Sequence, residues 1–201
     1  MEADLARIPL VSPETLTPGQ RRIYDAVVAG PRGAVVGPLR AALHSPELAD
    51  RWQRLGEFLR YHTSLPPRLN ELAILVTARR WNSQVEFYIH AKAARNAGLP
   101  ELVIEAIRLA QPPAFDDADD ADIYEYARAL QETGQVPEPL YERIAARWGA
   151  VGIVEITAVI GYYTMVSMTL NVHEIPLPDD ASPPLSSGAG LTALPPAQET
   201  K

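Results

Sequence analysis

The chain has 201 residues, of which 47% are hydrophobic, and its formal net charge is -7 at pH 7. This length and apolar content allow one well-buried domain with flexible ends. An acidic chain without a clustered Lys/Arg stripe does not suit a phosphate backbone, so we expect no nucleic-acid partner. The sequence has no cysteine, which excludes disulfides, cysteine-bound zinc, iron–sulfur clusters and thiol redox chemistry in this chain.

Two stretches bear on location. The first residues, MEADLARIPLVSPETL, are polar and interrupted by proline rather than basic and then apolar. We therefore expect no secretory signal and a cytoplasmic protein. The most apolar run, 151–170, is interrupted by Glu155, Gly161 and two tyrosines, which favours a buried helix over a membrane span.

In chain order, residues 1–16 lack sustained periodicity and predict an extended arm. Thr17 and Pro18 predict a helix start, because the hydroxyl can cap and proline suits the first turn. The loop 31–45 is apolar enough to pack over the body. Helical periodicity and cap residues together predict eight helices, at about 18–30, 46–61, 67–80, 83–97, 101–110, within 115–134, and at 137–149 and 150–171.

The third of these helices is apolar over most of its circumference, which predicts a central position in the fold. After residue 175 the chain becomes rich in Pro, Ser, Gly and Ala, so we expect a mobile tail at 176–201 whose first part can attach to the body. No segment with alternating apolar and polar residues predicts a strand more strongly than a helix. The predicted fold is all-α, with seven or eight helices in a single domain at 17–175.

The stretch 68–97, RLNELAILVTARRWNSQVEFYIHAKAARNA, is the place where ionisable groups fall on an otherwise apolar helical face. Glu86 and His90 lie one turn apart on that face and can hydrogen-bond. A buried carboxylate is costly unless it is paired or faces a wet cavity. Burial lowers the pKa of an imidazole and a carboxylate raises it, so this pair can be set near neutrality for acid/base work.

ELAILVTARRWNSQVEFYIHAKAARNAGLPELVIEAIR resembles the carboxymuconolactone decarboxylase family, which includes the AhpD-type alkylhydroperoxidases, over about residues 46–110. The resemblance implies an AhpD-like helical bundle. In the redox branch of that family, a Glu on one helix precedes a Cys-x-x-Cys-x-x-x-His motif on the next. The matching positions here are Glu71, Ser83, Glu86 and His90, so peroxidase chemistry through cysteine is excluded and the chain looks like the decarboxylase side of the family.

The resemblance implies catalytic roles for Glu86, His90 and Glu71. Each also has a purely structural interpretation. Glu86 fits a capping box with Ser83, His90 fits a core histidine bonded to a carbonyl, and Glu71 is favourable near a helix start.

We expect Ser83, Arg80 and Trp81 to contact the substrate. Arg60, Arg79 and Arg80 are candidates for holding a carboxylate, and Arg80 is the best placed of them. Ser83 also suits a cap, Trp81 suits core packing and an arginine on a helix is often simply solvated. No second histidine lies at ligand spacing, so we expect no metal, and no cofactor.

The sequence thus predicts a cofactor-free lyase, a decarboxylase or isomerase, acting on a small unsaturated lactone or carboxylic acid. The alternatives are a lactone or ester hydrolase and a non-catalytic ligand-binding member of the family. The expected partners are a small-molecule substrate and further copies of the chain, in a homo-oligomer that the family resemblance implies to be a trimer or hexamer. No membrane partner is expected.

Overall fold

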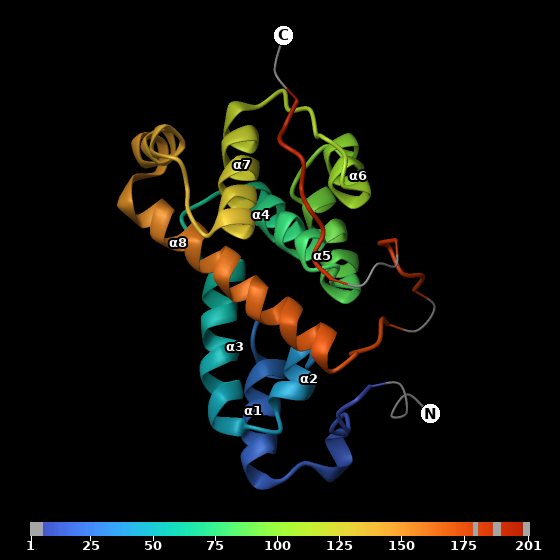
Figure 1. The fold of residues 1–201 in the computed structure, drawn as a ribbon. Helices are drawn as coiled ribbons and strands as arrows, with labels where there is room; N and C mark the ends of the chain where they lie inside the picture. Colours follow the sequence, from blue (N-terminus) through green and yellow to red (C-terminus); the bar gives the residue numbers. More distant parts are fainter. Residues whose placement is uncertain (1–5, 179–180, 187–189, 199–201) are drawn as a thin grey trace.

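The computed structural model describes residues 6–178, 181–186 and 190–198. These residues form eight α-helices and no strand, together with a 3-10 turn at Pro13–Thr15 (Figure 1). The helices are α1 (Pro18–Ala29), α2 (Pro38–Ala42), α3 (Pro46–Tyr61), α4 (Pro67–Arg80), α5 (Gln84–Asn96), α6 (Glu101–Leu109), α7 (Ala118–Thr133) and α8 (Glu138–Val172). The all-α prediction is confirmed.

The helices begin where cap and proline signals predicted. At α1, the Thr17 hydroxyl accepts from the Gln20 amide, and the Gln20 side chain accepts from the Thr17 amide. The short helix α2 was not predicted, because five residues are too few to show a periodicity. It forms inside the loop 31–45, and its residues Leu39, Ala41 and Ala42 are buried. The loop therefore packs over the body as expected.

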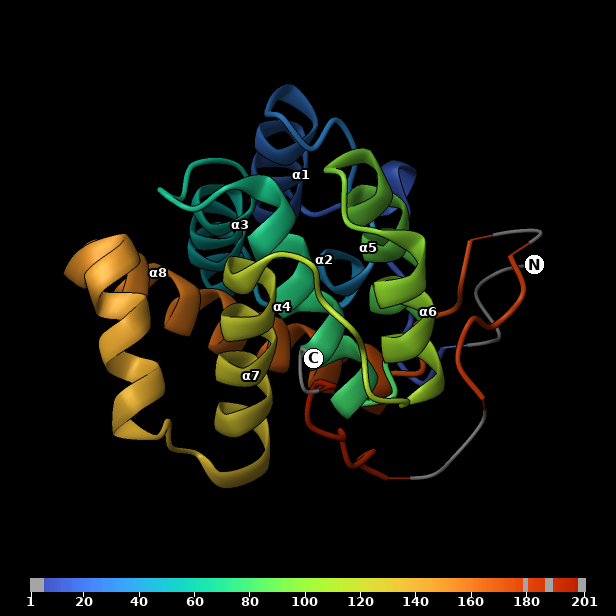
Figure 2. The same ribbon diagram turned by 90° about the horizontal axis from the view of Figure 1, so that it is seen from above.

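Helix α4 is the centre of the fold, as its apolar circumference predicted. Every residue from Leu69 to Arg79 is buried. Figure 2 shows α4 surrounded by the other helices, and it packs most extensively against α5, α7 and α8. Because α4 packs closely against α5, a polar side chain on α4 that faces α5 is shielded from bulk water.

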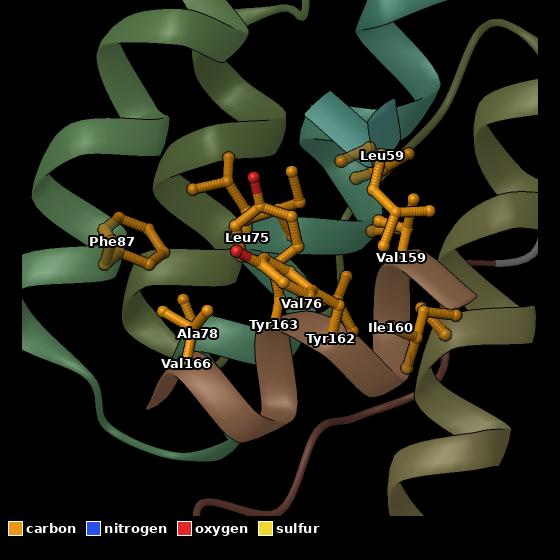
Figure 3. Close-up of a cluster of buried hydrophobic side chains, with 14 of the residues drawn as sticks. Leu59, Leu75, Val76, Ala78, Phe87, Val159, Ile160, Tyr162, Tyr163 and Val166 are labelled. Atoms are coloured by element: carbon orange, nitrogen blue, oxygen red, sulfur yellow. The ribbon is translucent and has the colours of Figure 1, made fainter. Parts of the chain in front are cut away.

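Helix α8 joins the two predicted helices 137–149 and 150–171 across a kink at Gly149, where φ is 65° and ψ is -176°. Its second half crosses α4 and brings Tyr162 and Tyr163 into the core beside side chains from α3, α4 and α5 (Figure 3). By length and composition alone α8 is apolar enough to cross a membrane. The contacts that it makes with α3, α4 and α7 instead identify it as a core helix.

The described ends of the chain lie on the body. In the arm, the Arg7 amide donates to the His173 carbonyl. In the C-terminal segment, Thr192 exchanges backbone and side-chain hydrogen bonds with Arg80, and Leu185 and Leu194 are buried. Figure 1 shows this segment passing along α5 towards α7. Residues 1–5, 179–180, 187–189 and 199–201 of the predicted arm and tail lie outside the described residues.

Candidate active site

Three ionisable side chains meet between α4 and α5. His90 Nδ1 lies 2.6 Å from Glu71 Oε2, and His90 Nε2 lies 2.8 Å from Glu86 Oε1. The exposed fractions of Glu71, Glu86 and His90 are 7%, 3% and 2%. Each ring nitrogen therefore faces a carboxylate, and we name these three residues the Glu–His–Glu triad.

Local sequence accounts for half of this arrangement. Glu86 and His90 stand at i and i+4 on α5, which is the spacing of neighbours on one helix face. Glu71 comes from α4, and the turn at residues 81–83 folds α5 back against α4. Asn82 has a φ of 50° in that turn. The tight turn and the packing of the two helices together bring Glu71 to the second ring nitrogen.

The triad carries a charged histidine. Burial by itself lowers the pKa of His90, but the charges of Glu71 and Glu86 and their hydrogen bonds raise it to about 9. At neutral pH the ring is therefore an imidazolium that donates to both carboxylates. This differs from the expectation of a pKa near neutrality, because the sequence showed one adjacent carboxylate and the fold supplies two.

A small cavity of about 40 Å³ lies on the Glu86 side of the triad. Glu86 and His90 form its polar wall, and its other walls come from α3, α8 and the segment 32–39. The Tyr163 ring stands edge-on to His90, with ring centroids 4.9 Å apart. Burial raises the pKa of Tyr162 to about 12 and that of Tyr163 well above its ordinary value, so both hydroxyls keep their protons at neutral pH.

A second hollow, of about 340 Å³, lies on the Glu71 side of the triad. Thr63, Asn70 and Glu71 supply its polar groups, and Arg60 lines both this hollow and the small cavity. Arg60 was predicted as a carboxylate-holding candidate, and the structure brings it to the site. The triad thus separates two spaces, with a different carboxylate facing each.

The structure does not bring Arg80 to either space. Arg80 pairs with Glu132 at 3.0 Å and donates to the Thr192 carbonyl at 2.9 Å. The correction follows from the C-terminal segment, whose docking on the end of α4 the sequence did not predict. Arg80 therefore anchors this segment rather than a substrate.

Ser83 and Trp81 also lie outside the small cavity. Ser83 is fully buried, and its hydroxyl makes no cap bond at the start of α5, so the predicted capping box with Glu86 is wrong. Glu86 is turned towards His90 instead. The Trp81 indole donates to Gln131 at 3.0 Å, and Trp81 also lines a larger, mostly apolar hollow of about 900 Å³ near the end of α8.

Arg32 is a cavity residue that the sequence reasoning missed. The signal available was a single arginine in the otherwise uncharged stretch GPRGAVVGP. Tyr162 and Tyr163 occur in the long apolar helix, and no spacing connects them to Glu86 or His90. Only the crossing of α8 over α4 brings them to the triad.

The triad does not have the form of a metal site. Within the described ranges, no group of three His, Asp or Glu side chains is arranged to hold a metal ion. At the triad, each imidazole nitrogen of His90 faces a carboxylate oxygen, so neither nitrogen has a free lone pair for coordinating a metal ion.

The model of the carboxymuconolactone decarboxylase family matches residues 46–129. No curated protein matches the chain in sequence. The matched segment runs from the start of α3 into α7 and includes all three triad residues.

Several solved structures share the fold. An AhpD-core, peroxidase-related protein from Ralstonia eutropha JMP134 has a TM-score of 0.69 and 14% identity, over 88% of this chain and 94% of that one. A peroxidase-related protein from Silicibacter sp. TM1040 has a TM-score of 0.68 and 14% identity, over 86% and 92%. A protein of unknown function from Agrobacterium tumefaciens, titled a putative antioxidant defence protein AhpD, has a TM-score of 0.60 and 20% identity, over 70% and 97%.

The likeness to these structures establishes the architecture, and the family match covers the helices that build the triad. The absence of cysteine from the sequence agrees with the branch of the family that lacks the Cys-x-x-Cys pair. Residues 46–129 of this chain, which build the Glu–His–Glu triad, are thus similar to the carboxymuconolactone decarboxylase family, and the chain has an AhpD-like fold.

Proposed function

We propose that this protein is a cofactor-free acid/base enzyme that decarboxylates or isomerises a small unsaturated carboxylic acid or lactone. The observation that carries the proposal is the triad itself, in which the buried His90 ring is held between two carboxyl groups beside a small cavity. Burying three ionisable groups is costly for a fold unless they are paired. Strongly perturbed groups in a cleft are characteristic of acid/base sites.

In this proposal each residue has a different role, which its position supports. Glu86 lines the cavity and is the base that removes a proton from carbon next to an unsaturated carbonyl. The electron pair moves to the carbonyl oxygen, and in isomerisation the same proton returns at the far end of the conjugated system. His90 holds Glu86 in place and balances its charge, and Glu71 keeps His90 oriented and protonated. Arg60, on the same cavity, stabilises the enolate oxygen.

In the decarboxylation variant, the carbon–carbon bond to the carboxylate breaks and its electron pair forms the enolate. Carbon dioxide leaves, and a proton from the His90–Glu86 pair is added to the carbon. Both variants need the same anion stabilisation. They differ in product mass, because one loses carbon dioxide and the other leaves the mass unchanged.

The test is conversion of a panel of unsaturated lactones and carboxylic acids, followed by mass spectrometry, for wild type and Glu86→Gln. Glu101→Gln is the matched control, because Glu101 pairs with Arg95 in an exposed ion pair and neither residue lines the cavity. We expect Glu86→Gln to lower turnover by roughly a hundredfold or more while circular dichroism stays native, and Glu101→Gln to leave turnover unchanged.

Other products would contradict the proposal. A gain of one water identifies a hydrolase. No conversion of any compound by wild type supports a non-catalytic ligand-binding protein. Equal turnover by wild type and Glu86→Gln places the chemistry elsewhere in the molecule.

A further inference from the structure

We propose that Arg32, on the loop between α1 and α2, is the residue that recognises a carboxylate group of the ligand in the small cavity. The inference rests on the proposed function for the reaction that follows binding, but the binding step is measurable without turnover. The inference concerns specificity, because Arg32 would select a carboxylate over a neutral lactone or amide at this position.

The first observation is a partly buried guanidinium that has no carboxylate partner among the described residues. Nε and Nη2 of Arg32 are buried, and neither makes a hydrogen bond of ordinary geometry to the residues that the structure describes; the polar group beside the guanidinium is the Tyr162 hydroxyl, which interacts with it. In that same part no carboxylate lies within ion-pair distance of Arg32, whereas the exposed Arg51 and Arg54 both have carboxylate partners. A desolvated donor without an acceptor is costly. A bound anion removes that desolvation cost, and a guanidinium can bind a carboxylate through two parallel hydrogen bonds.

The second observation is the space made for this side chain on α3. A methyl group at Gly56 would overlap both Arg32 Nη2 and the Tyr162 hydroxyl oxygen. The guanidinium and the hydroxyl therefore approach one point on α3, where only glycine leaves room for them. Tyr162 Oη also lies 3.5 Å from the Trp52 carbonyl, a long contact that leaves the hydroxyl available to a ligand.

The third observation is the balance of charge. The triad contributes two carboxylates and one imidazolium, and Arg32 and Arg60 line the cavity beside it. Counted at their formal charges, with His90 as an imidazolium, the five groups carry a net charge of +1. A monocarboxylate neutralises this charge, and a neutral lactone does not.

The size of the cavity favours the head group of a small acid. About 40 Å³ holds roughly three waters, at about 10–15 Å³ for each. The remaining walls near Arg32 are apolar, from Val36, Pro38 and Leu39, and suit a short hydrocarbon chain attached to the carboxylate. An anion held by Arg32 lies in the same cavity as Glu86, which the proposed reaction requires.

The test compares crotonate with crotonamide, its neutral analogue of nearly the same shape. Calorimetric titration of the full chain is run for wild type, Arg32→Gln and Arg32→Lys. Arg51→Gln is the matched control, because it removes one positive charge from an exposed pair on the outer surface of α3. Circular dichroism checks that each variant is folded.

We expect wild type and Arg51→Gln to bind crotonate at least about tenfold more tightly than crotonamide. Arg32→Gln is expected to lose that preference, and Arg32→Lys to retain part of it. Equal binding of crotonate by wild type and Arg32→Gln, or no preference for crotonate in wild type, overturns the inference.

The two proposals fail separately. If crotonate binds through Arg32 but no compound in the panel is converted, the carboxylate site stands and the reaction does not. If an acid is converted with the same KM by wild type and Arg32→Gln, the reaction stands and the role of Arg32 is wrong.

Discussion

Raising the pH from about 6 to about 10 is expected to destabilise the fold through His90, by about 3 kcal/mol in total. The folded pKa of His90 is about 9, against an ordinary value of 6.5. Burial by itself lowers the pKa of His90, but the charges and hydrogen bonds of Glu71 and Glu86 raise it by more. At about 1.4 kcal/mol for each pH unit, the difference corresponds to an order of 3 kcal/mol.

The sign follows from proton binding. Below about pH 6.5 both the folded and the unfolded chain hold the proton on His90, and the stabilisation is fully present. Between about pH 6.5 and about pH 9 the unfolded chain has lost that proton and the folded chain keeps it, so unfolding releases a proton and becomes easier as the pH rises. Above about pH 9 the stabilisation from this group is lost.

Glu71→Gln is the informative variant, because the charge of Glu71 is the largest contribution that raises the His90 pKa. The amide keeps a hydrogen-bond acceptor for Nδ1–H and removes the charge. We expect the His90 pKa to fall, and the loss of stability with pH to become smaller and to end at a lower pH. Glu101→Gln, in an exposed pair with Arg95, is expected to leave this pH window unchanged.

The assay is urea unfolding at fixed protein concentration across that pH range, with ¹⁵N NMR of the imidazole nitrogens reporting protonation directly. A His90 ring that titrates at or below about pH 6.5 refutes the reasoning. So does an unfolding free energy that stays level or rises between about pH 6.5 and about pH 9.

Three further predictions concern the scaffold. Gly149→Ala is expected to cost about 1–3 kcal/mol because φ is 65° there, whereas Gly161→Ala, at an open helical position of α8, is expected to gain up to about 1 kcal/mol. Chemical denaturation checks both, and equal effects would contradict the strain argument. Gly56→Ala is expected to cost about 1–3 kcal/mol by overpacking and to move Tyr162, which a crystal structure or its NMR signals would show. Unchanged stability and unchanged signals would contradict the close contact. Deleting residues 190–201 is expected to lower the free energy of unfolding by about 2 kcal/mol or more, because buried Leu194 is lost. The NMR signals of the His90 ring are expected to stay in place. A shift of those signals would show that this segment supports the triad.

The positions of the helices were predictable because their signals are local. The Thr17 cap with Pro18, and the prolines at the starts of α3 and α4, act within one turn of each helix end. Gly149 divided the predicted helices, and the kink in α8 occurs at that residue. The one missed helix, α2, is too short to carry a periodicity. The fold class and helix boundaries thus depend on interactions between near neighbours in the chain.

The pairing of Glu86 with His90 was predictable for the same reason, since a helix places i and i+4 side by side. Glu71 was predicted from the spacing of a family motif. Its contact with Nδ1 depends on how α4 and α5 pack, and so does the charge on His90, because the second carboxylate raises the pKa.

The surroundings of the triad were decided by tertiary structure alone. Arg32 reaches the cavity because its loop folds over α3 at Gly56, and Tyr163 reaches it because α8 crosses α4. Arg80 was expected beside the substrate but lies against the C-terminal segment. Local sequence determines the face of a helix on which a side chain lies. The partner that it meets there is determined by the packing of segments far apart in the chain, which no spacing within one helix encodes.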